Sequence, residues 1–449
     1  MSEKDASIST IKESDKVRSS SWIETPIGEL PSEWEVSWLD DICTINPDGF
    51  PEDEWPEETF EYISLSNVSE GKILQSDTTT IDDAPSRAQR GVKKGDVLVG
   101  TVRPKQVSHG IVTEEHDGKI CSSGFGVLRS PANLNAFYLL QEVLSHRFFR
   151  QMEAYVAGSG YPAVKIGDLR KHRIAVPPLE EQRKIASVLY TVDQAIQQTD
   201  EILEQAEKVQ TGVMQDLFRN GVEEGPIKEL RRIGKVPEHW DVINLGDVCH
   251  KITDGTHFSP PTIDEGYPYI TSKNIRDWGF DLDDLKYISE EDHKEIISSC
   301  NPEQGDVLYV KDGANTGNVY VNTLDFEFSL LSSVALIKPD KDQIKPWFLK
   351  YLFTWPKFRQ LVLSQMSGTG ISRLTISKLE KTDILLPPID EQNKITEILD
   401  NFHEYQSVHR RKRGKLSRLK RGLMQDLLSG KVRTHDKDIE IVDEVLAHG

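Results

Sequence analysis

The chain has 449 residues, of which 37% are hydrophobic and 28% charged, and its formal net charge is −19. This composition is ordinary for a globular protein with apolar cores, and the length suggests about two to four domains. The acidity argues against a simple basic protein that coats DNA.

The chain contains no apolar run of the ~18–20 residues that a membrane span needs, and its polar N-terminus lacks the apolar core of a secretory signal. We therefore expect a cytoplasmic protein that does not contact membranes. Cys43, Cys121, Cys249 and Cys300 form no CxxC pair. We expect ordinary thiols, with no metal site and no disulfide framework.

Residues 34–150 predict short strands punctuated by turns, and a helical pattern follows over 136–150. Pro177-Pro178 then precedes a long helix over about 179–218, which would be roughly 60 Å long at 1.5 Å per residue. Its apolar residues follow the 3,4 spacing of a coiled-coil seam. Residues 240–367 repeat the first plan, with a helical pattern over 346–363. The second long helix has a less regular seam, because His409 and Lys412 interrupt it.

The chain repeats itself. Ile27-Gly28-x-x-Pro31-x-x-Trp34-x-Val36 returns at Ile233, Gly234, Pro237, Trp240 and Val242, an offset of 206. The Gly-Asp-Val-Leu stretch from Gly95, the Pro-Pro pair from Pro177 and the Glu-Gln-x-Lys-Ile stretch from Glu181 all return 210 residues later. The ends of the two copies match and their middles mostly differ. One framework that presents two different surfaces fits this pattern better than drift after duplication.

These elements predict an α+β protein with two mixed α/β recognition domains, separated by two long antiparallel helices in a circular pseudo-twofold arrangement. The predicted boundaries are a flexible N-terminal tail at 1–20, a first domain at 21–165, a first spacer helix at 166–222, a second domain at 223–375, a second spacer helix at 376–432 and a C-terminal tail at 433–449.

The order of a variable domain, Pro-Pro-[Leu/Ile]-[Glu/Asp]-Glu-Gln-x-Lys-Ile and a long helix, occurring twice, resembles the specificity subunit of type I restriction-modification enzymes. The stretch from Lys251 to Pro261, which contains Asp254-Gly-Thr256-His257, is also similar to that family. The first copy departs from it, with Asn46-Pro47-Asp48-Gly49-Phe50 in the corresponding place. The resemblance covers about residues 22–432.

The resemblance implies that each domain reads one half of a bipartite site in double-stranded DNA, while the helices set the spacer and dock two modification subunits. Restriction or motor subunits can join the complex. S-adenosylmethionine, ATP and Mg would then belong to the partners, and this chain would have no cofactor and no catalytic residues. The sequence agrees with this division, since it has no phosphate-binding loop and no Asn/Asp-Pro-Pro-Tyr/Phe methyltransferase motif.

Base reading needs polar side chains on exposed loops. In the first domain, the candidates are Lys93, Lys94, Arg103, Lys105, Gln106, His109, Ser122 and Ser123. In the second, they are Asp254, Thr256, His257, Lys273, Asn274, Lys311, Asn315 and Thr316. The glycines of 158–160 and 368–370 could let the backbone approach phosphate. The alternative is that all of these are solvated loop residues and turn glycines.

Apolar residues of the two helices form the candidate helix or partner-subunit interface: Ile185, Val188, Val192, Ile202, Val209, Ile395, Ile398, Phe402, Leu416 and Leu419. The basic run 408–421 is either a solvated face, a dock for a partner or a track for DNA phosphates. Two other functions stay open on the residues alone. One is a methyltransferase or nuclease acting by itself, and the other is a helical scaffold that never contacts DNA.

Overall fold

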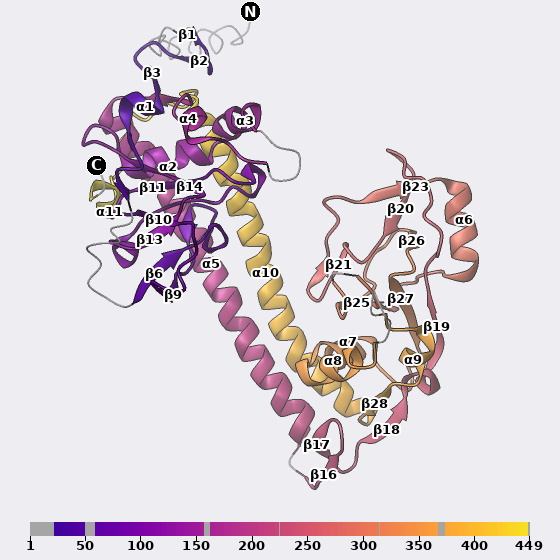
Figure 1. The fold of residues 1–449 in the computed structure, drawn as a ribbon. Coiled ribbons are helices and arrows are strands. Elements are labelled where there is room, and N and C mark those ends of the chain that lie inside the picture. Colours follow the sequence, from indigo (N-terminus) through magenta and orange to yellow (C-terminus); the bar gives the residue numbers. More distant parts are fainter. Residues whose placement is uncertain are drawn as a thin grey trace, which may run out of the picture. The chain divides into compact units, whose positions relative to one another are not determined.

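The computed structural model describes residues 22–49, 59–156, 162–223, 225–313, 315–366 and 373–447. Its contacts divide the chain into two units: residues 1–198 with 413–449, and residues 199–412. Each long helix contributes to both units, so each unit contains one α/β domain and a segment of each helix (Figure 1). Within the described residues, no helix is long and apolar enough to cross a membrane.

The first unit begins with a hairpin of β1 (Trp22–Thr25) and β2 (Gly28–Pro31), and β3 (Glu35–Trp38) pairs with β15 (Arg173–Val176). A five-stranded sheet has the order β5-β10-β13-β6-β9 and a four-stranded sheet has the order β12-β11-β14-β4. Their bounds are β4 Thr44–Ile45, β5 Asp48–Gly49, β6 Thr59–Ile63, β9 Asp77–Thr80, β10 Ala88–Gly91, β11 Val97–Gly100, β12 His109–Ile111, β13 Ile120–Ser122 and β14 Phe125–Arg129. The remaining short elements are β7 Val68–Ser69, β8 Lys72–Ile73, α1 Leu39–Ile42 and α4 Ile166–Leu169.

The second unit repeats this plan. A hairpin of β16 (Ile227–Leu230) and β17 (Gly234–Pro237) precedes the pairing of β18 (Asp241–Asn244) with β28 (Asp383–Leu386). A four-stranded sheet has the order β19-β27-β24-β25 and a three-stranded sheet has the order β23-β20-β26. Their bounds are β19 Cys249–Asp254, β20 Tyr267–Ile270, β23 Lys286–Ile288, β24 Val307–Val310, β25 Val319–Val321, β26 Ser329–Leu330 and β27 Val334–Pro339. The remaining short elements are β21 Ile275–Arg276, β22 Gly279–Phe280, α6 Glu290–Ser299 and α9 Ile376–Glu380.

The sequence repeat is therefore a repeat of topology. The order β12-β11-β14-β4 in the first unit corresponds to β25-β24-β27-β19 in the second. In both units the second sheet contains one parallel pair, β13 with β6 and β26 with β20. The repeated Gly-Asp-Val-Leu stretches lead into β11 and β24, which are central and buried at all four positions.

Both helical patterns predicted within the domains are present, and the structure divides each into two helices. Residues 136–150 lie in α2 (Ala136–Leu144) and α3 (His146–Ala154), because Ser145 ends the first helix and its side chain accepts from the amide of Phe148. Residues 346–363 lie in α7 (Pro346–Thr354) and α8 (Pro356–Leu363). Pro356 restricts the backbone of the preceding residue away from the helical region and separates the two.

The long helices are α5 (Leu179–Asn220) and α10 (Ile389–Leu428). The Glu-Gln pair near the start of each explains the repeated motif. Gln182 donates to the carbonyl of Pro177 (2.8 Å) and accepts from the amide of Asn135 (2.9 Å). Gln392 makes the corresponding bonds to Pro387 and Lys345, at 2.9 and 2.8 Å. Each glutamine thereby fixes the start of a long helix to the α/β domain beside it.

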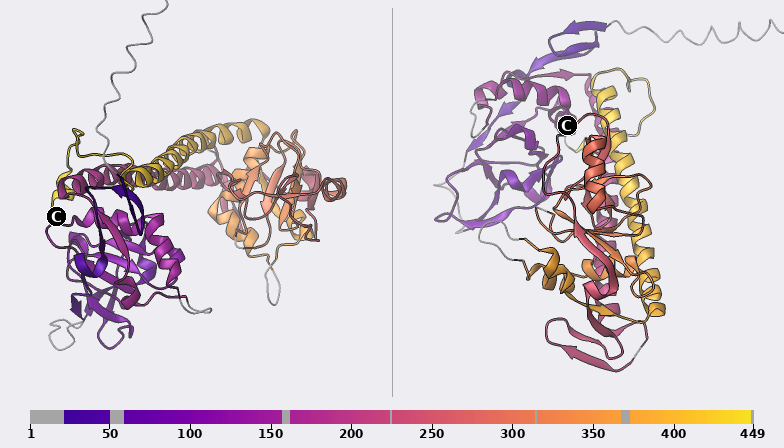
Figure 2. Two further views of the ribbon diagram at one scale, coloured as in Figure 1. Left: turned by 90° about the horizontal axis from the view of Figure 1, so that it is seen from above. Right: turned by 90° about the vertical axis from the view of Figure 1, so that its right-hand side faces the viewer.

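The helices lie side by side within each unit, at one flank of the α/β domain (Figures 1 and 2). In the first unit Lys420 pairs with Asp193 at 2.6 Å. In the second, Gln406 donates to Gln210 at 2.9 Å and Arg410 pairs with Glu207. As the residue number rises along α5 it falls along α10, so the predicted antiparallel pairing is confirmed within the second unit.

The predicted apolar seam is not buried along its whole length. Ile185 and Ile395 are fully buried, but they belong to the cores of the α/β domains rather than to a purely helical interface. Val188 and Ile398 pack against the same cores, and Val192, Ile202, Phe402 and Leu416 are half-buried. By contrast Val209 and Leu419 are 54% and 51% exposed. These two side chains are therefore available to a partner and do not hold the helices together.

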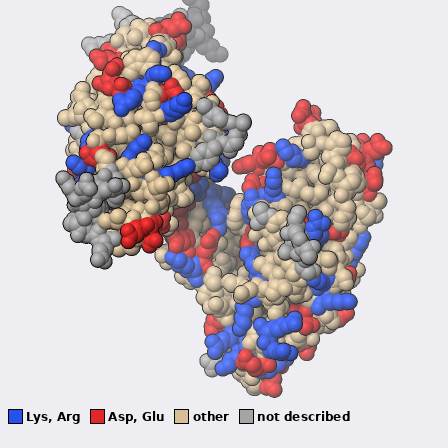
Figure 3. Space-filling model, in the orientation of Figure 1, with Lys and Arg blue, Asp and Glu red and all other residues tan. Residues whose placement is uncertain are grey.

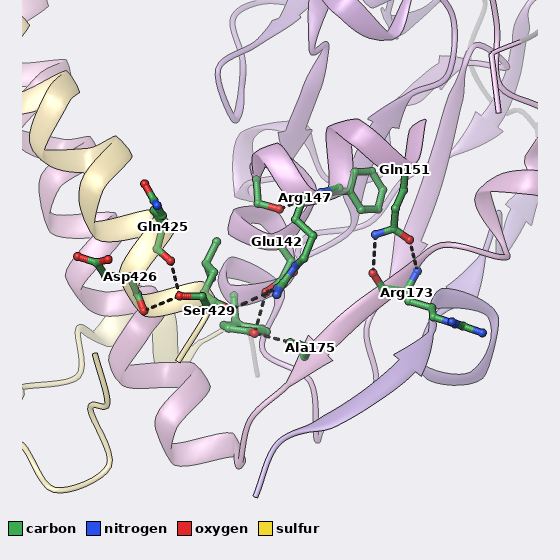
Figure 4. A network of polar contacts seen from close by, with 12 residues as sticks. Glu142, Arg147, Gln151, Arg173, Ala175, Gln425, Asp426 and Ser429 are labelled. Carbon is green, nitrogen blue, oxygen red and sulfur yellow. Dashed lines mark hydrogen bonds and ion pairs between the residues drawn. The ribbon is translucent and has the colours of Figure 1, made fainter. Parts of the chain in front are cut away.

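The end of the chain returns to the first domain. Arg147 of α3 pairs with Glu142 (2.7 Å) and also donates to the carbonyl of Leu428 at the end of α10 (Figure 4). Residues 433–447, which the sequence marks only as a C-terminal tail, pack against the same unit. Val445, in α11 (Asp443–Leu446), is fully buried, and its carbonyl accepts from Asn135 at 2.8 Å. This closure of the chain onto its first domain is the predicted circular arrangement.

Candidate nucleic-acid interface

The loop after β11 presents three of the predicted side chains. Arg103, Lys105 and Gln106 are exposed on a short 3-10 turn, Pro104–Gln106, at the end of the central strand. The turn is bounded by Arg103 (φ 49°) and Val107 (φ 47°), and a β-branched residue rarely adopts this left-handed conformation. The surrounding chain holds the Arg103 end of this turn in place, since the amide of Arg103 donates to the carbonyl of Pro162 at 2.8 Å.

Lys93 and Lys94 are exposed but lie before β11, at the opposite end of the strand from Arg103. Four strand residues separate two such ends by about 13 Å. Both lysines also have acidic neighbours, since Lys94 pairs with Glu114 at 2.8 Å and Lys93 lies 3.9 Å from Asp48. The structure therefore does not gather the first-domain candidates into one site.

Two other candidates of the first domain are buried, which corrects the expectation that they are exposed loop residues. His109 is 1% exposed, and its Nδ1 accepts from the amide of Gly100 at 3.1 Å. Burial lowers the pKa of His109 to about 4, so its ring is neutral. Ser122 is buried and accepts from the amide of Gly124, which fixes the turn after β13, while its neighbour Ser123 is half-buried.

In the second domain three loops from different parts of the chain converge. The Asp254 carboxylate pairs with Lys311 (3.1 Å) and contacts His257 (3.3 Å), which joins the 254–257 loop to the loop after β24. The side chain of Asn315 donates to the carbonyl of Ser272 at 2.9 Å and so brings in the 271–274 loop. His257 and Lys273 are exposed at this junction.

Several candidates of the second domain hold these loops in place rather than presenting a free polar group. Lys311, Asn274 and Thr256 are 6–8% exposed, again against the expectation of exposure. Asn274 accepts from the amide of Thr271 and donates to the carbonyl of Asp281, at 2.9 and 3.0 Å. Thr316 is half-buried and donates to the carbonyl of Gly313 at 2.6 Å. The sequence pattern thus located the loops better than it located their exposed side chains.

The structure adds two residues to this junction, Ser272 and Ser333. The amide of Ser272 donates to the Ser333 hydroxyl at 3.3 Å, which joins the 271–274 loop to the turn after β26. Ser333 was predictable from the sequence repeat. Ser332 and Ser333 lie 210 residues after Ser122 and Ser123, and β24 likewise lies 210 residues after β11.

The distribution of charge does not mark a DNA-binding face on either domain in the view of Figure 3. Lys and Arg are interspersed with Asp and Glu on the face of each unit seen in Figure 3. The glycines of 158–160 and 368–370 lie outside the residues that the structure describes. Among the described residues no group of three or more His, Cys, Asp or Glu side chains could hold a metal ion. Burial raises the pKa of all four cysteine thiols to about 12.

Comparison with known proteins identifies the duplicated framework. The model of the family described as the type I restriction modification DNA specificity domain matches residues 31–208 and again 237–418. A putative type I restriction enzyme MjaX specificity subunit from Methanocaldococcus jannaschii is 27% identical over 438 residues, which are 91% of this chain and 96% of the relative. The EcoKI specificity subunit from Escherichia coli is 20% identical over 399 residues, 84% of each chain.

A solved structure shares the fold. The crystal structure of a type I restriction-modification system S subunit from M. genitalium matches with a TM-score of 0.52 at 15% identity, over 88% of this chain and 96% of that chain. Together with the two matches to the family model, this shared fold defines a duplicated DNA specificity module. With both copies matched by the family model, the chain belongs to the type I restriction-modification DNA specificity family. It is the non-catalytic DNA-recognition subunit of such a system.

Proposed function

We propose that each α/β domain reads one half of a bipartite site in double-stranded DNA, through the loops that follow β11 in the first domain and β24 in the second. The supporting observation is that the two domains share one topology while these loops differ in chemistry. The loop after β11 presents Arg103, Lys105 and Gln106. The loop after β24 contributes Asn315 and lies beside the exposed His257 and Lys273 of the 254–257 and 271–274 loops. Different polar groups on the same framework would select different base edges.

The chain assembles with other subunits of its restriction-modification system, and we propose that two modification subunits bind, one for each copy of the repeat. A twofold internal repeat offers two equivalent surfaces, and equivalent surfaces bind equivalent partners. The exposed Val209 of α5 and Leu419 of α10 are candidates for this contact. S-adenosylmethionine, ATP and Mg would act on the partner subunits, including a restriction subunit where one joins, and the complex would work in the cytoplasm.

The acidity of the chain limits its own electrostatic attraction to DNA. With a net charge of −19, the isolated subunit gains little from the electrostatic attraction that dominates nonspecific DNA affinity. Partner subunits would therefore supply much of the phosphate contact, and the subunit alone would bind DNA weakly.

A domain exchange tests the proposed division of labour. Residues 240–367 are replaced by the corresponding segment of a relative, the complex is reassembled in cells, and the methylated sites are mapped by sequencing. We expect one half of the recognised sequence to change while the other half stays. The mirror exchange of residues 34–157 is the matched control and should change the other half. Unchanged sites in both exchanges would contradict the proposal, as would loss of both halves in a complex that still assembles.

A further inference from the structure

The second unit contains a polar pocket of about 400 Å³, a volume in the range of small-molecule sites. It is lined by residues of α5, α7, α8 and α10 and of the segment around β21. Its charged lining residues are Arg276, Lys350, Arg359, Arg410, Glu207 and Asp277. The lining thus carries a net charge of +2 in a strongly acidic protein. His403 also lines it and stays neutral, because burial lowers its pKa to about 4.

Lys350 is the unusual member of this set. It is 3% exposed and lines the pocket, yet its ammonium has no hydrogen bond or ion pair among the residues that the structure describes. The ammonium lies near two aromatic rings, with Nζ 4.2 Å from the ring centroid of Tyr351 and 6.0 Å from that of Tyr320. A buried charge without an anionic partner is costly, so a partner from outside the chain would stabilise it.

The acids near Lys350 are already engaged. Asp400 accepts from the Tyr351 hydroxyl at 2.6 Å. Asp277 accepts from the amide of Val319 (3.0 Å) and from Arg359 (2.5 Å). The guanidinium groups of the pocket, by contrast, keep donor capacity. The Nε atoms of Arg359 and Arg410 are buried and have no hydrogen-bond partner within the described part of the chain. Arg410 pairs with Glu207 and Arg359 with Asp277, yet each guanidinium keeps an Nε donor that no acceptor in the described part of the chain uses.

The first copy of the repeat serves as an internal control. Helices α2 and α7 begin and end 210 residues apart, so Lys350 corresponds to Leu140, which is buried in the core of the first unit. Arg359 corresponds to Phe149, and Arg410 on α10 corresponds to Asp200 on α5. The framework thus folds without these cations, and nothing in the fold requires a lysine at this position.

We propose that this pocket binds a phosphate-bearing anion, with Lys350 and the guanidinium groups of Arg359 and Arg410 as its ligands. Two phosphate charges match the net charge of the lining, and arginine groups bind phosphate oxygens with directed, charge-assisted hydrogen bonds. Trp278, 40% exposed beside the pocket with the Arg410 guanidinium 5.4 Å from its ring, offers an aromatic surface next to that phosphate site. The anion could be free in solution or belong to a nucleic-acid backbone.

Calorimetric titration of the full-length chain with pyrophosphate at constant ionic strength tests the site. We expect saturable binding by the unaltered protein and binding weakened by about tenfold or more in Lys350→Leu, which installs the residue of the first copy. Lys350→Met gives a second variant of similar volume. Lys357→Met is the matched control, because Lys357 is exposed on α8 outside the pocket, and it should leave the affinity within about twofold.

Competition separates the two sources of phosphate. A DNA duplex that displaces pyrophosphate from the unaltered chain identifies a backbone phosphate as the occupant. A duplex without effect, at a concentration shown by fluorescence anisotropy to saturate the chain, identifies a free anion. No saturable pyrophosphate binding, or equal binding by Lys350→Leu in a folded protein, overturns the proposal. The proposed reading of half-sites is unaffected by that result, since it is tested by the domain exchange.

Discussion

Replacing Glu181 by glutamine should release the C-terminal segment from the first unit. The Glu181 side chain is 1% exposed and accepts from Arg433 Nε (2.8 Å), the amide of Thr434 (3.2 Å) and the indole of Trp34 (3.0 Å). It therefore joins the N-terminal region, α5 and residues 433–434 at one buried carboxylate. Glutamine has nearly the same shape, but it brings an amide NH₂ and no charge to the Arg433 guanidinium.

The expected loss is about 3 kcal/mol, the lower end of what removing one partner of a buried ion pair costs. The lower end applies because Arg433 keeps its second partner, Glu33, at 2.7 Å. The corresponding change in the second unit, Glu391→Gln, should cost about 1.5 kcal/mol, because the donors there carry no fixed charge. They are the Trp240 indole (3.0 Å), the amide of Val222 (3.1 Å) and His239 (2.7 Å).

Hydrogen exchange followed by mass spectrometry measures the effect locally. A loss of 3 kcal/mol should speed exchange in residues 433–447 on the order of 100-fold, while peptides of the second unit change little. Glu180→Gln is the matched control, since Glu180 is 73% exposed and pairs with Lys184 on its own helix. An exchange rate in Glu181→Gln equal to that of the control would refute this reasoning, and so would equal acceleration in both units.

The same contact gives a pH dependence of known sign. Burial alone would raise the pKa of Glu181, but hydrogen bonds from Arg433, Thr434 and Trp34 lower it below the ordinary value of 4.5. A carboxylate with a depressed pKa in the folded state stabilises that state above its unfolded pKa. The stabilisation is lost as the pH falls below about 4.5 through the folded pKa. Residues 433–447 of the unaltered protein should therefore open in acid, whereas Glu181→Gln should show little further change there.

Three further outcomes follow from the structure. Burial lowers the pKa of Lys350 from 10.5 to about 8, so in phosphate-free buffer the free energy of unfolding of the second unit should rise between about pH 8 and 10.5. Lys350→Leu should abolish that rise and add about 3 kcal/mol at pH 7, as measured by denaturant unfolding; an unchanged pH profile would count against burial of the charge. In the assembled complex, Arg103→Ala and Lys105→Ala should each lower the slope of log affinity against log salt by about 1, and an unaltered slope would remove them from the DNA contact. The buried thiols of Cys43, Cys121 and Cys300 should resist iodoacetamide at pH 8 until the protein unfolds, whereas their rapid labelling in the native chain would contradict this burial.

The sequence predicted the elements whose signals are local and repeated. Pro177 and the acidic first turn placed the start of α5 within a residue, and the 210-residue offset predicted that α10 has the same design. It could not predict that α2 ends at Ser145, because a serine with apolar periodicity on both sides is compatible with one continuous helix. There the side chain of Ser145 caps α3 instead of continuing α2.

The candidate site was predicted at the level of loops and not of side chains. Lys311 and His257 are neighbours in the structure through Asp254, although 54 positions separate them in the chain. Nothing local shows that Lys311 is buried by this contact while His257 is exposed. The same holds for His109, whose buried ring accepts a hydrogen bond from the amide of Gly100 in the neighbouring strand. Exposure is set by tertiary contacts, which a single sequence does not contain.

The composition of the two cores explains why the Glu-Gln motif and the helix ends are the parts that repeat. The first core combines Ile185 from the start of α5 with Leu427 from the end of α10, and the second combines Ile395 with Leu217 in the same way. Each domain is therefore completed by a helix end from the other copy. A substitution in a reading loop affects residues of one copy alone. A substitution in a helix end or in Glu181 instead disturbs a unit that is built from residues of both copies. The loops are thus free to diverge in sequence while the helix ends are constrained, which is the pattern of agreement seen between the two halves of the chain.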